Sequence, residues 1–277
     1  MALKISLCNE VIRELPFARQ CELIKQLGYD GIEIAPFTLD QNPHRLSPTK
    51  IAKVKKIAAD AGVEITSLHY LMVAPAGLNI TDRDKTVRGR SVEVMRALCG
   101  LAAELGAKML IHGSPAQRTI EPGDEAEGKK RGLESFAAAA EAADKAGVTY
   151  IVEPLAPQDT SFVTSVDEAA AIVRAIGRTS LKTMIDCSAM GRAGYAIPDL
   201  IRKWLPSGLI AHVHLNDPSR RGPGEGEMKF APILEALFEQ NYSGMAAIEP
   251  FIYEPDGPSC AARQIGYVRG LIEAMKR

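Results

Sequence analysis

The sequence is poor in the features that mark several specialised classes of protein. Its five cysteines are scattered and include no CxxC pair, which argues against a disulfide framework and against a thiolate zinc site. Its 33 basic and 34 acidic side chains give a formal net charge of −1, so no overall positive field favours nucleic acid. No apolar run approaches the roughly eighteen residues that a membrane helix needs. We therefore expect neither nucleic acid nor a membrane as a partner.

The N-terminal segment MALKISLCNE has no charged start and no long apolar run, and it alternates in the manner of a β-strand. It is therefore unlike a signal peptide, and together with the scattered cysteines it favours the reducing cytoplasm. The chain has 277 residues, of which 46% are hydrophobic, and this is enough to bury a large core. Because no linker or low-complexity segment interrupts it, we expect one domain over residues 1–277.

Short β-rich runs alternate with longer helical patterns, which end at glycines that supply positive φ. Strands are predicted at residues 4–8, 31–35, 64–70, 108–112, 149–153, 182–186, 210–214 and 245–249. Helices are predicted at residues 17–27, 48–61, 82–105, 125–146, 165–176, 198–204, 230–238 and 259–275. Such strict alternation over about 250 residues is typical of a single (β/α)8 TIM barrel in the α/β class. Two doubly wound domains would also alternate, but the chain has no break near its middle.

Ligand-type side chains stand at the ends of six predicted strands. These residues are His69, His112, Glu153, Asp186, His214 and Glu249. The carboxyl ends of the strands carry the active sites of TIM barrels, so function is expected there. Residues two apart on a strand share a face, so Glu153 and Asp186 should both point into the barrel. The acidic side chains are therefore expected to converge on one axis.

Carboxylates that converge repel one another, and burying even one unpaired charge is costly. A divalent cation held by Glu153, Asp186, His214 and Glu249 would remove this conflict. Three oxygen donors and one imidazole favour Mn²⁺, with Mg²⁺ and Co²⁺ as alternatives, over a thiolate-type zinc site. Each residue alone has a simpler explanation, since a strand-end Glu often serves only as a salt-bridge partner. Four such residues on four successive strands favour the metal site.

With these strand ends the chain resembles the xylose isomerase-like TIM barrel superfamily, and within it the ketose 3-epimerases related to D-tagatose and D-psicose 3-epimerase. The resemblance is carried by GYDGIEI (28–34), HGSPAQR (112–118), EPLAPQDTSFVTS (153–165), IDCSAM (185–190), HLNDPSRRGPGEG (214–226) and AIEPF (247–251). It implies one divalent metal ion held by the same quartet, and a keto-sugar that chelates it. In the HVH sequence it implies that His214 is the ligand and that His212 is a core or supporting residue.

The resemblance also implies the reaction, in which the ion polarises the sugar carbonyl and makes the adjacent C–H acidic. Glu153 and Glu249 would form the acid/base pair, one removing the C3 proton and the other returning a proton to the opposite face of the enediolate. Arg220 and Asp159 match substrate contacts of the epimerases, although those enzymes carry Glu at the second position. A homo-oligomer, either a dimer or a tetramer, is implied as well.

His69 and His112 are further candidates for substrate contacts at the rim, and hydrogen-bonded histidines at loop starts are the alternative. Ala189 stands where the epimerases have a substrate-contacting histidine, so their sugar specificity is not carried over. Glu33 is expected to point inward, where an internal polar pair would explain it equally well. The RRGPGEG loop could seat a phosphate group, but a mobile lid is the favoured interpretation.

Three other functions stay open. Family 2 AP endonucleases, which are phosphodiesterases, share the barrel and the HLND motif, but Ala189 replaces a histidine ligand and no DxH pair follows HLND here. Dehydratases of keto-polyols, of the inosose or 3-dehydroshikimate type, share the enolisation step, so the metal quartet does not separate them from epimerases. The paired EPL and EPF glutamates favour the epimerase. A sugar-binding barrel without catalysis is the third alternative.

Overall fold

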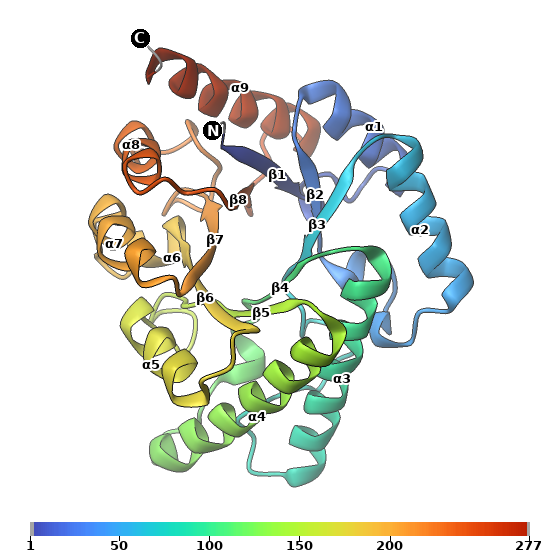
Figure 1. Cartoon of the computed structure of the whole chain (residues 1–277), viewed down its shortest axis with the longest axis vertical. Coiled ribbons are helices and arrows are strands. Elements are labelled where there is room, and N and C mark those ends of the chain that lie inside the picture. Colours follow the sequence, from blue (N-terminus) through green and yellow to red (C-terminus); the bar gives the residue numbers. More distant parts are fainter. Residues whose placement is uncertain (1–2, 276–277) are drawn as a thin grey trace. The chain divides into compact units, whose positions relative to one another are not determined.

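The computed structural model describes residues 3–275, and in it eight parallel strands follow one another in sequence order around a closed barrel (Figure 1). The strands are β1 (Lys4–Cys8), β2 (Gly31–Ile34), β3 (Glu64–Leu68), β4 (Met109–His112), β5 (Thr149–Val152), β6 (Leu181–Asp186), β7 (Ile210–Leu215) and β8 (Met245–Ile248). The predicted (β/α)8 TIM barrel is confirmed, and each predicted strand begins and ends within two residues of the observed one.

The described residues form nine α-helices, one more than predicted. They are α1 (Phe17–Leu27), α2 (Pro48–Asp60), α3 (Lys85–Leu105), α4 (Glu125–Ala146), α5 (Val166–Ile176), α6 (Cys187–Arg192), α7 (Ile197–Trp204), α8 (Ala231–Glu239) and α9 (Gly257–Met275). Short 3-10 helices also occur, among them η1 (Asn9–Ile12) directly after β1. As predicted, α1 and α3 end at glycines with positive φ, Gly28 at 80° and Gly106 at 87°.

The unpredicted helix is α6, which follows β6 without a loop. It begins because the side chain of Asp186 accepts a hydrogen bond from the backbone N–H of Ala189 at 2.6 Å, as an N-cap residue does. Six residues are too few to show a helical period in the sequence. The predicted metal ligand Asp186 therefore also starts a helix.

The residues fall into two compact units that alternate along the chain. The first unit contains residues 3–33, 56–64 and 184–275, and the second contains residues 34–55 and 65–183. In the first unit, β1 pairs with β2 and with β8, and β7 pairs with β8. In the second unit, β3, β4, β5 and the first half of β6 pair in that order. One domain over residues 1–277 stays a prediction.

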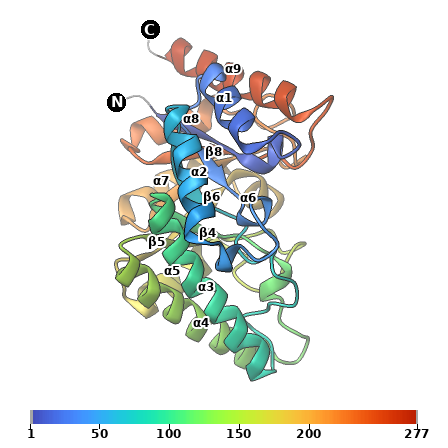
Figure 2. The same cartoon turned by 90° about the vertical axis from the view of Figure 1, so that its right-hand side faces the viewer.

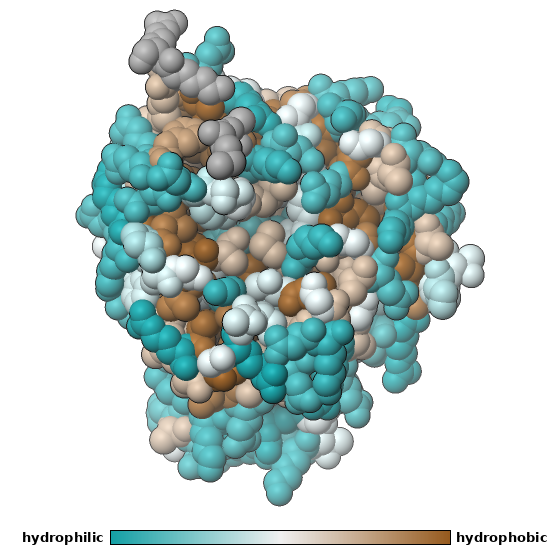
Figure 3. Space-filling view, viewed as in Figure 1, coloured by the Kyte–Doolittle hydropathy of each residue, from teal (hydrophilic) through white to brown (hydrophobic). Residues whose placement is uncertain are grey.

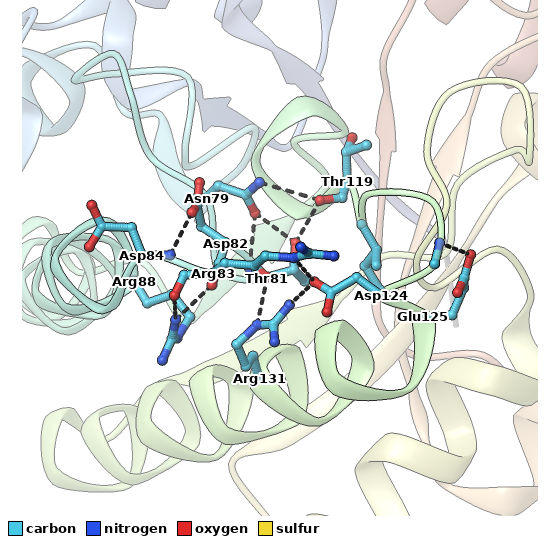
Figure 4. Close-up of polar contacts among 12 residues, drawn as sticks. Asn79, Thr81, Asp82, Arg83, Asp84, Arg88, Thr119, Asp124, Glu125 and Arg131 are labelled. Atoms are coloured by element: carbon cyan, nitrogen blue, oxygen red, sulfur yellow. Dashed lines mark hydrogen bonds and ion pairs between the residues drawn. The ribbon is translucent and has the colours of Figure 1, made fainter.

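In the second unit, α3 and α4 run side by side (Figure 2), and Asp124 joins the loops that precede them (Figure 4). Asp124 Oδ2 lies 3.1 Å from Arg83 Nε and also forms an ion pair with Arg131. Arg131 Nε donates a hydrogen bond to the carbonyl of Thr81 at 2.9 Å, and the Thr81 hydroxyl donates to the carbonyl of Thr119 at 2.7 Å. The loop after β3 is thereby tied to the loop after β4.

Teal, hydrophilic side chains cover much of the face seen in Figure 3. Among the described residues, Tyr195 is the single large hydrophobic side chain that is exposed, at 39%. None of the helices in residues 3–275 combines the length and the apolar character that a membrane span requires.

The N-terminus of α5 offers a test of the local structure. The Ser165 hydroxyl accepts a hydrogen bond from the backbone N–H of Glu168 at 3.1 Å, which satisfies one of the free donors of the helix end. We expect Ser165→Ala to lower the free energy of unfolding by about 1 kcal/mol, measured by chemical denaturation. Ser165→Asp keeps an acceptor at this position and should stay close to the wild type. Equal losses in both variants would contradict this role of Ser165.

Candidate functional site

Three of the four predicted metal ligands belong to the first unit and lie together at the ends of β6, β7 and β8. His214 Nδ1 lies 2.9 Å from Glu249 Oε2 and 3.4 Å from Asp186 Oδ2. One ligand atom from each of the three side chains lies within 4.8 Å of the others. All three residues are buried, with exposed fractions of 3% for Asp186, 0% for His214 and 4% for Glu249. The geometry and the donor types fit a divalent cation.

Asn216, two residues after His214, connects the two carboxylates of this cluster. Its Nδ2 donates to Asp186 Oδ2 at 2.8 Å and to Glu249 Oε2 at 3.3 Å, and its Oδ1 accepts from the backbone N–H of Ser188 at 2.8 Å. The sequence placed Asn216 in the HLND motif but assigned it no role. A neutral amide orients two buried carboxylates without neutralising their charge, and this favours a cation beside them.

Glu33, at the end of β2, contacts the opposite side of the His214 ring. Its Oε1 lies 2.8 Å from His214 Nε2, and its Oε2 lies 3.0 Å from His212 Nε2. All three side chains are fully buried. Burial raises the pKa of Glu33, but its electrostatic interactions with His212 and His214 outweigh this and hold it well below its usual range. The internal polar pair proposed for Glu33 is thus present, and His212 is a core residue as predicted.

Glu153 belongs to the second unit and follows β5 directly. Its exposed fraction is 4%, and its backbone N–H donates to the carbonyl of His112 at 3.3 Å. Its side chain lies over Gly113 so closely that a Cβ atom at that position would be 1.6 Å from Glu153 Oε2. Gly113 is therefore needed for the present position of the Glu153 carboxylate. The role of this glycine could not be predicted from the sequence, because the contact depends on the side-chain conformation of Glu153.

His112 lies on a different face from the one expected of a substrate contact. It is in register with Val152, and neighbouring residues on a strand point to opposite faces, so His112 and Glu153 point to opposite sides. His112 Nδ1 lies 2.8 Å from the Tyr150 hydroxyl, and its ring meets Phe136 of α4 edge to face at 5.2 Å. Burial and the nearby Arg118 hold the pKa of His112 well below its usual range. This environment fits the alternative, a hydrogen-bonded core histidine.

The other predicted substrate contacts differ in their surroundings. His69 is fully buried directly after β3, and Asp159 is exposed on the loop after β5. Arg220 is exposed in the first unit, with its guanidinium 5.1 Å from the centre of the Phe251 ring. Ala189 is buried on α6. Arg220 is therefore held near the segment that follows Glu249, as a contact to a substrate at that strand end would require.

Hydrogen bonds connect the RRGPGEG loop to α9. These bonds disagree with the favoured interpretation of the loop as a mobile lid. Glu225 accepts hydrogen bonds from Gln264 Nε2 at 2.7 Å and from Arg263 Nε at 2.9 Å. A Cβ atom at Gly222 would lie 2.1 Å from the side chain of Gln264, whereas Gly224 alone of the three loop glycines has a positive φ, of 81°. Close packing against α9 explains Gly222 better than a tight turn does.

Comparisons with known proteins identify similar sugar epimerases. The chain is similar to the D-psicose 3-epimerase of Agrobacterium fabrum, with 27% identity over 240 residues that cover 85% of this chain and 80% of that enzyme. It is also similar to the fructoselysine 3-epimerase of Shigella flexneri, with 23% identity over 260 residues that cover 91% of each protein.

Among solved structures, the 3-keto-D-glucoside 4-epimerase of E. coli is similar with a TM-score of 0.84 and 20% identity, over 97% of this chain and 100% of that one. At this identity the likeness concerns the fold alone. Residues 21–271 match the sequence profile of the xylose isomerase-like TIM barrel family. Since that match spans most of the sequence, the chain belongs to the xylose isomerase-like TIM barrel family.

Proposed function

We propose that the protein is a divalent-metal-dependent isomerase that epimerises a keto-sugar at C3. The observation that carries the proposal is the buried cluster of Asp186, His214 and Glu249. The similar D-psicose and fructoselysine 3-epimerases support an isomerase that acts on sugars. The same cluster would also serve a dehydratase, so the similar epimerases are what favours epimerisation over dehydration.

Glu153 is proposed as the fourth ligand of the ion. β5 and β6 pair up to Val152 and Thr183, and β6 continues without a break to Asp186. In a closed parallel barrel the carboxyl ends of the strands meet at one rim, so Glu153 and Asp186 are expected to face the same centre. Three carboxylates and one imidazole suit Mn²⁺, with Mg²⁺ and Co²⁺ as alternatives.

A bound ion would act as a Lewis acid on the sugar carbonyl and lower the pKa of the adjacent C–H. Glu249 and Glu153 then move the proton at C3, one carboxylate on each face of the enediolate. Asn216 holds the Glu249 carboxylate in place, and the burial of the cluster limits competition from water. Arg220 is proposed to bind sugar hydroxyls, and His69 and Asp159 remain candidates for the same role.

The first prediction concerns metal content and proton exchange. We expect about one divalent ion per chain in the purified protein, and incorporation of deuterium at C3 when a panel of ketoses is incubated with it in D₂O. Removal of the ion with a chelator should stop the exchange, and Mn²⁺ should restore it. Analysis of the products separates epimers from dehydrated sugars. A protein that binds no divalent ion and exchanges no C3 proton would disprove the proposed function.

The second prediction concerns the two glutamates. Glu249→Gln and Glu153→Gln should each slow epimerisation by about 10² to 10⁴, because each variant lacks one of the two proton-transfer groups. If the glutamates serve opposite faces, each variant should exchange the C3 proton of only one of the two epimers. The assay is run at saturating Mn²⁺ with the bound metal quantified, which separates loss of a base from loss of a ligand. Full activity in either variant would exclude that residue.

The third prediction uses Gly113, whose replacement removes no polar group. Gly113→Ala should push the Glu153 carboxylate aside and lower kcat/KM by about 100-fold, the effect of a displacement of roughly 1 Å at a reacting group. Gly100→Ala on α3 is the matched control, because a Cβ atom there meets nothing within 4 Å. Unchanged kinetics in Gly113→Ala would show that the position of Glu153 does not matter for the reaction.

A further inference from the structure

We propose that Glu33 is a positioning residue that fixes the tautomer of His214 and thereby directs His214 Nδ1 at the ion. The inference rests on the metal site of the proposed function, and it adds a residue that does not touch the ion or the sugar. Its basis is the row of side chains His212, Glu33 and His214, all fully buried in the first unit.

The hydrogen bond between Glu33 and His214 determines where the proton of His214 lies. A carboxylate is only an acceptor, so a nitrogen that bonds to it must carry the proton. Glu33 Oε1 faces His214 Nε2 at 2.8 Å, and Oε2 faces His212 Nε2 at 3.0 Å. A neutral His214 with its proton on Nε2 has its lone pair on Nδ1.

His214 Nδ1 lies 2.9 Å from Glu249 Oε2 and 3.4 Å from Asp186 Oδ2. A lone pair beside two carboxylates is repelled by them, but the same three atoms attract a divalent cation placed between them. Ligating histidines commonly donate their second N–H to a carboxylate, which orients the ring and makes the ligand more basic. Glu33 is in the position to do this for His214.

The surroundings keep Glu33 in this orientation. His212 Nε2 lies 3.0 Å from the second oxygen of the carboxylate, and Cys8 Sγ donates to Oε1 at 3.4 Å. Cys8 and Glu33 are in register on β1 and β2, and His214 is in register with Ala247 on β8. The orientation of His214 is therefore set by β2 before any ion binds.

The test measures metal affinity and not only activity. Glu33→Gln keeps the shape of the side chain. Its amide NH₂ group faces one of the two histidine N–H groups, and the proposed ligand His214 loses the negative charge next to its Nε2. We expect Mn²⁺ to bind about 10- to 100-fold more weakly in titration calorimetry. The absorption spectrum of the Co²⁺-loaded variant should also change, which a purely structural role of Glu33 would not cause.

Ser135→Ala is the control. The Ser135 hydroxyl is buried and donates to the carbonyl of Ile80 at 3.1 Å within the second unit, so the variant removes a buried polar contact that involves neither Glu33 nor a proposed metal ligand. Its Mn²⁺ affinity should equal that of the wild type. In case Glu33→Gln does not fold, His212→Leu replaces the polar side chain beside the second oxygen of Glu33 and should also weaken Mn²⁺ binding. His212→Gln keeps a polar side chain there and should restore it.

The outcomes separate this inference from the proposed function. Wild-type Mn²⁺ affinity in Glu33→Gln or His212→Leu, with a wild-type Co²⁺ spectrum, would overturn the role of Glu33 and leave the proposed function intact. A wild-type protein that binds no ion would overturn the proposed function itself. Glu33, His212 and His214 also offer atoms within 4.8 Å of one another. Two ions per wild-type chain would therefore make Glu33 a ligand and would overturn its positioning role.

Discussion

The burial of two carboxylates beside one imidazole is the constraint on which the site depends. Asp186 and Glu249 are almost without exposure to water, and each lies within 3.4 Å of His214 Nδ1. Removing the two carboxylates from water costs more free energy than hydrogen bonds from neighbouring neutral donors recover. The arrangement is therefore stable only with compensating positive charge. Asn216 donates hydrogen bonds to both carboxylates, and Glu33 contacts the other side of the His214 ring. Neither of them supplies that charge, and a divalent cation would.

Asp186 shows how closely this site is built into the fold. One of its oxygens accepts the N–H of Ala189 and begins α6, and the other bonds to Asn216 and lies near His214. Because the two oxygens of one carboxylate have different tasks, the direction of α6 and the direction of the ligand atom are coupled. A substitution at residue 186 would therefore alter the helix start as well as the cluster, and its effect on binding alone would be hard to isolate.

The sequence was sufficient for the barrel and for the strand-end residues because both follow from local patterns. The alternation of strands and helices can be predicted from short stretches of the sequence. Glu249 and His214 can each be recognised by their place at the end of an apolar run. The pairing of Glu33 with His214 spans 181 residues and depends on the closure of the barrel, so no local pattern reveals it. His112 shows the same limit of local patterns, because its place at a strand end is visible in the sequence but the face it occupies depends on register with Val152. The helix α6 was missed because a side-chain cap starts it.

The connection between Arg220 and Phe251 bears on how a sugar would be selected. Arg220 has a positive φ of 68°, and its carbonyl accepts hydrogen bonds from the N–H groups of Phe251 and Ile252 at 2.8 and 3.1 Å. A non-glycine residue in this conformation costs free energy, which the two hydrogen bonds and the guanidinium–ring contact help to offset. The loop after β7 is thus joined to the segment directly after Glu249. A sugar bound by Arg220 would lie against the same backbone segment that carries the proposed base Glu249. The residue that binds the sugar and the residue that moves its proton would then be positioned by connected backbone.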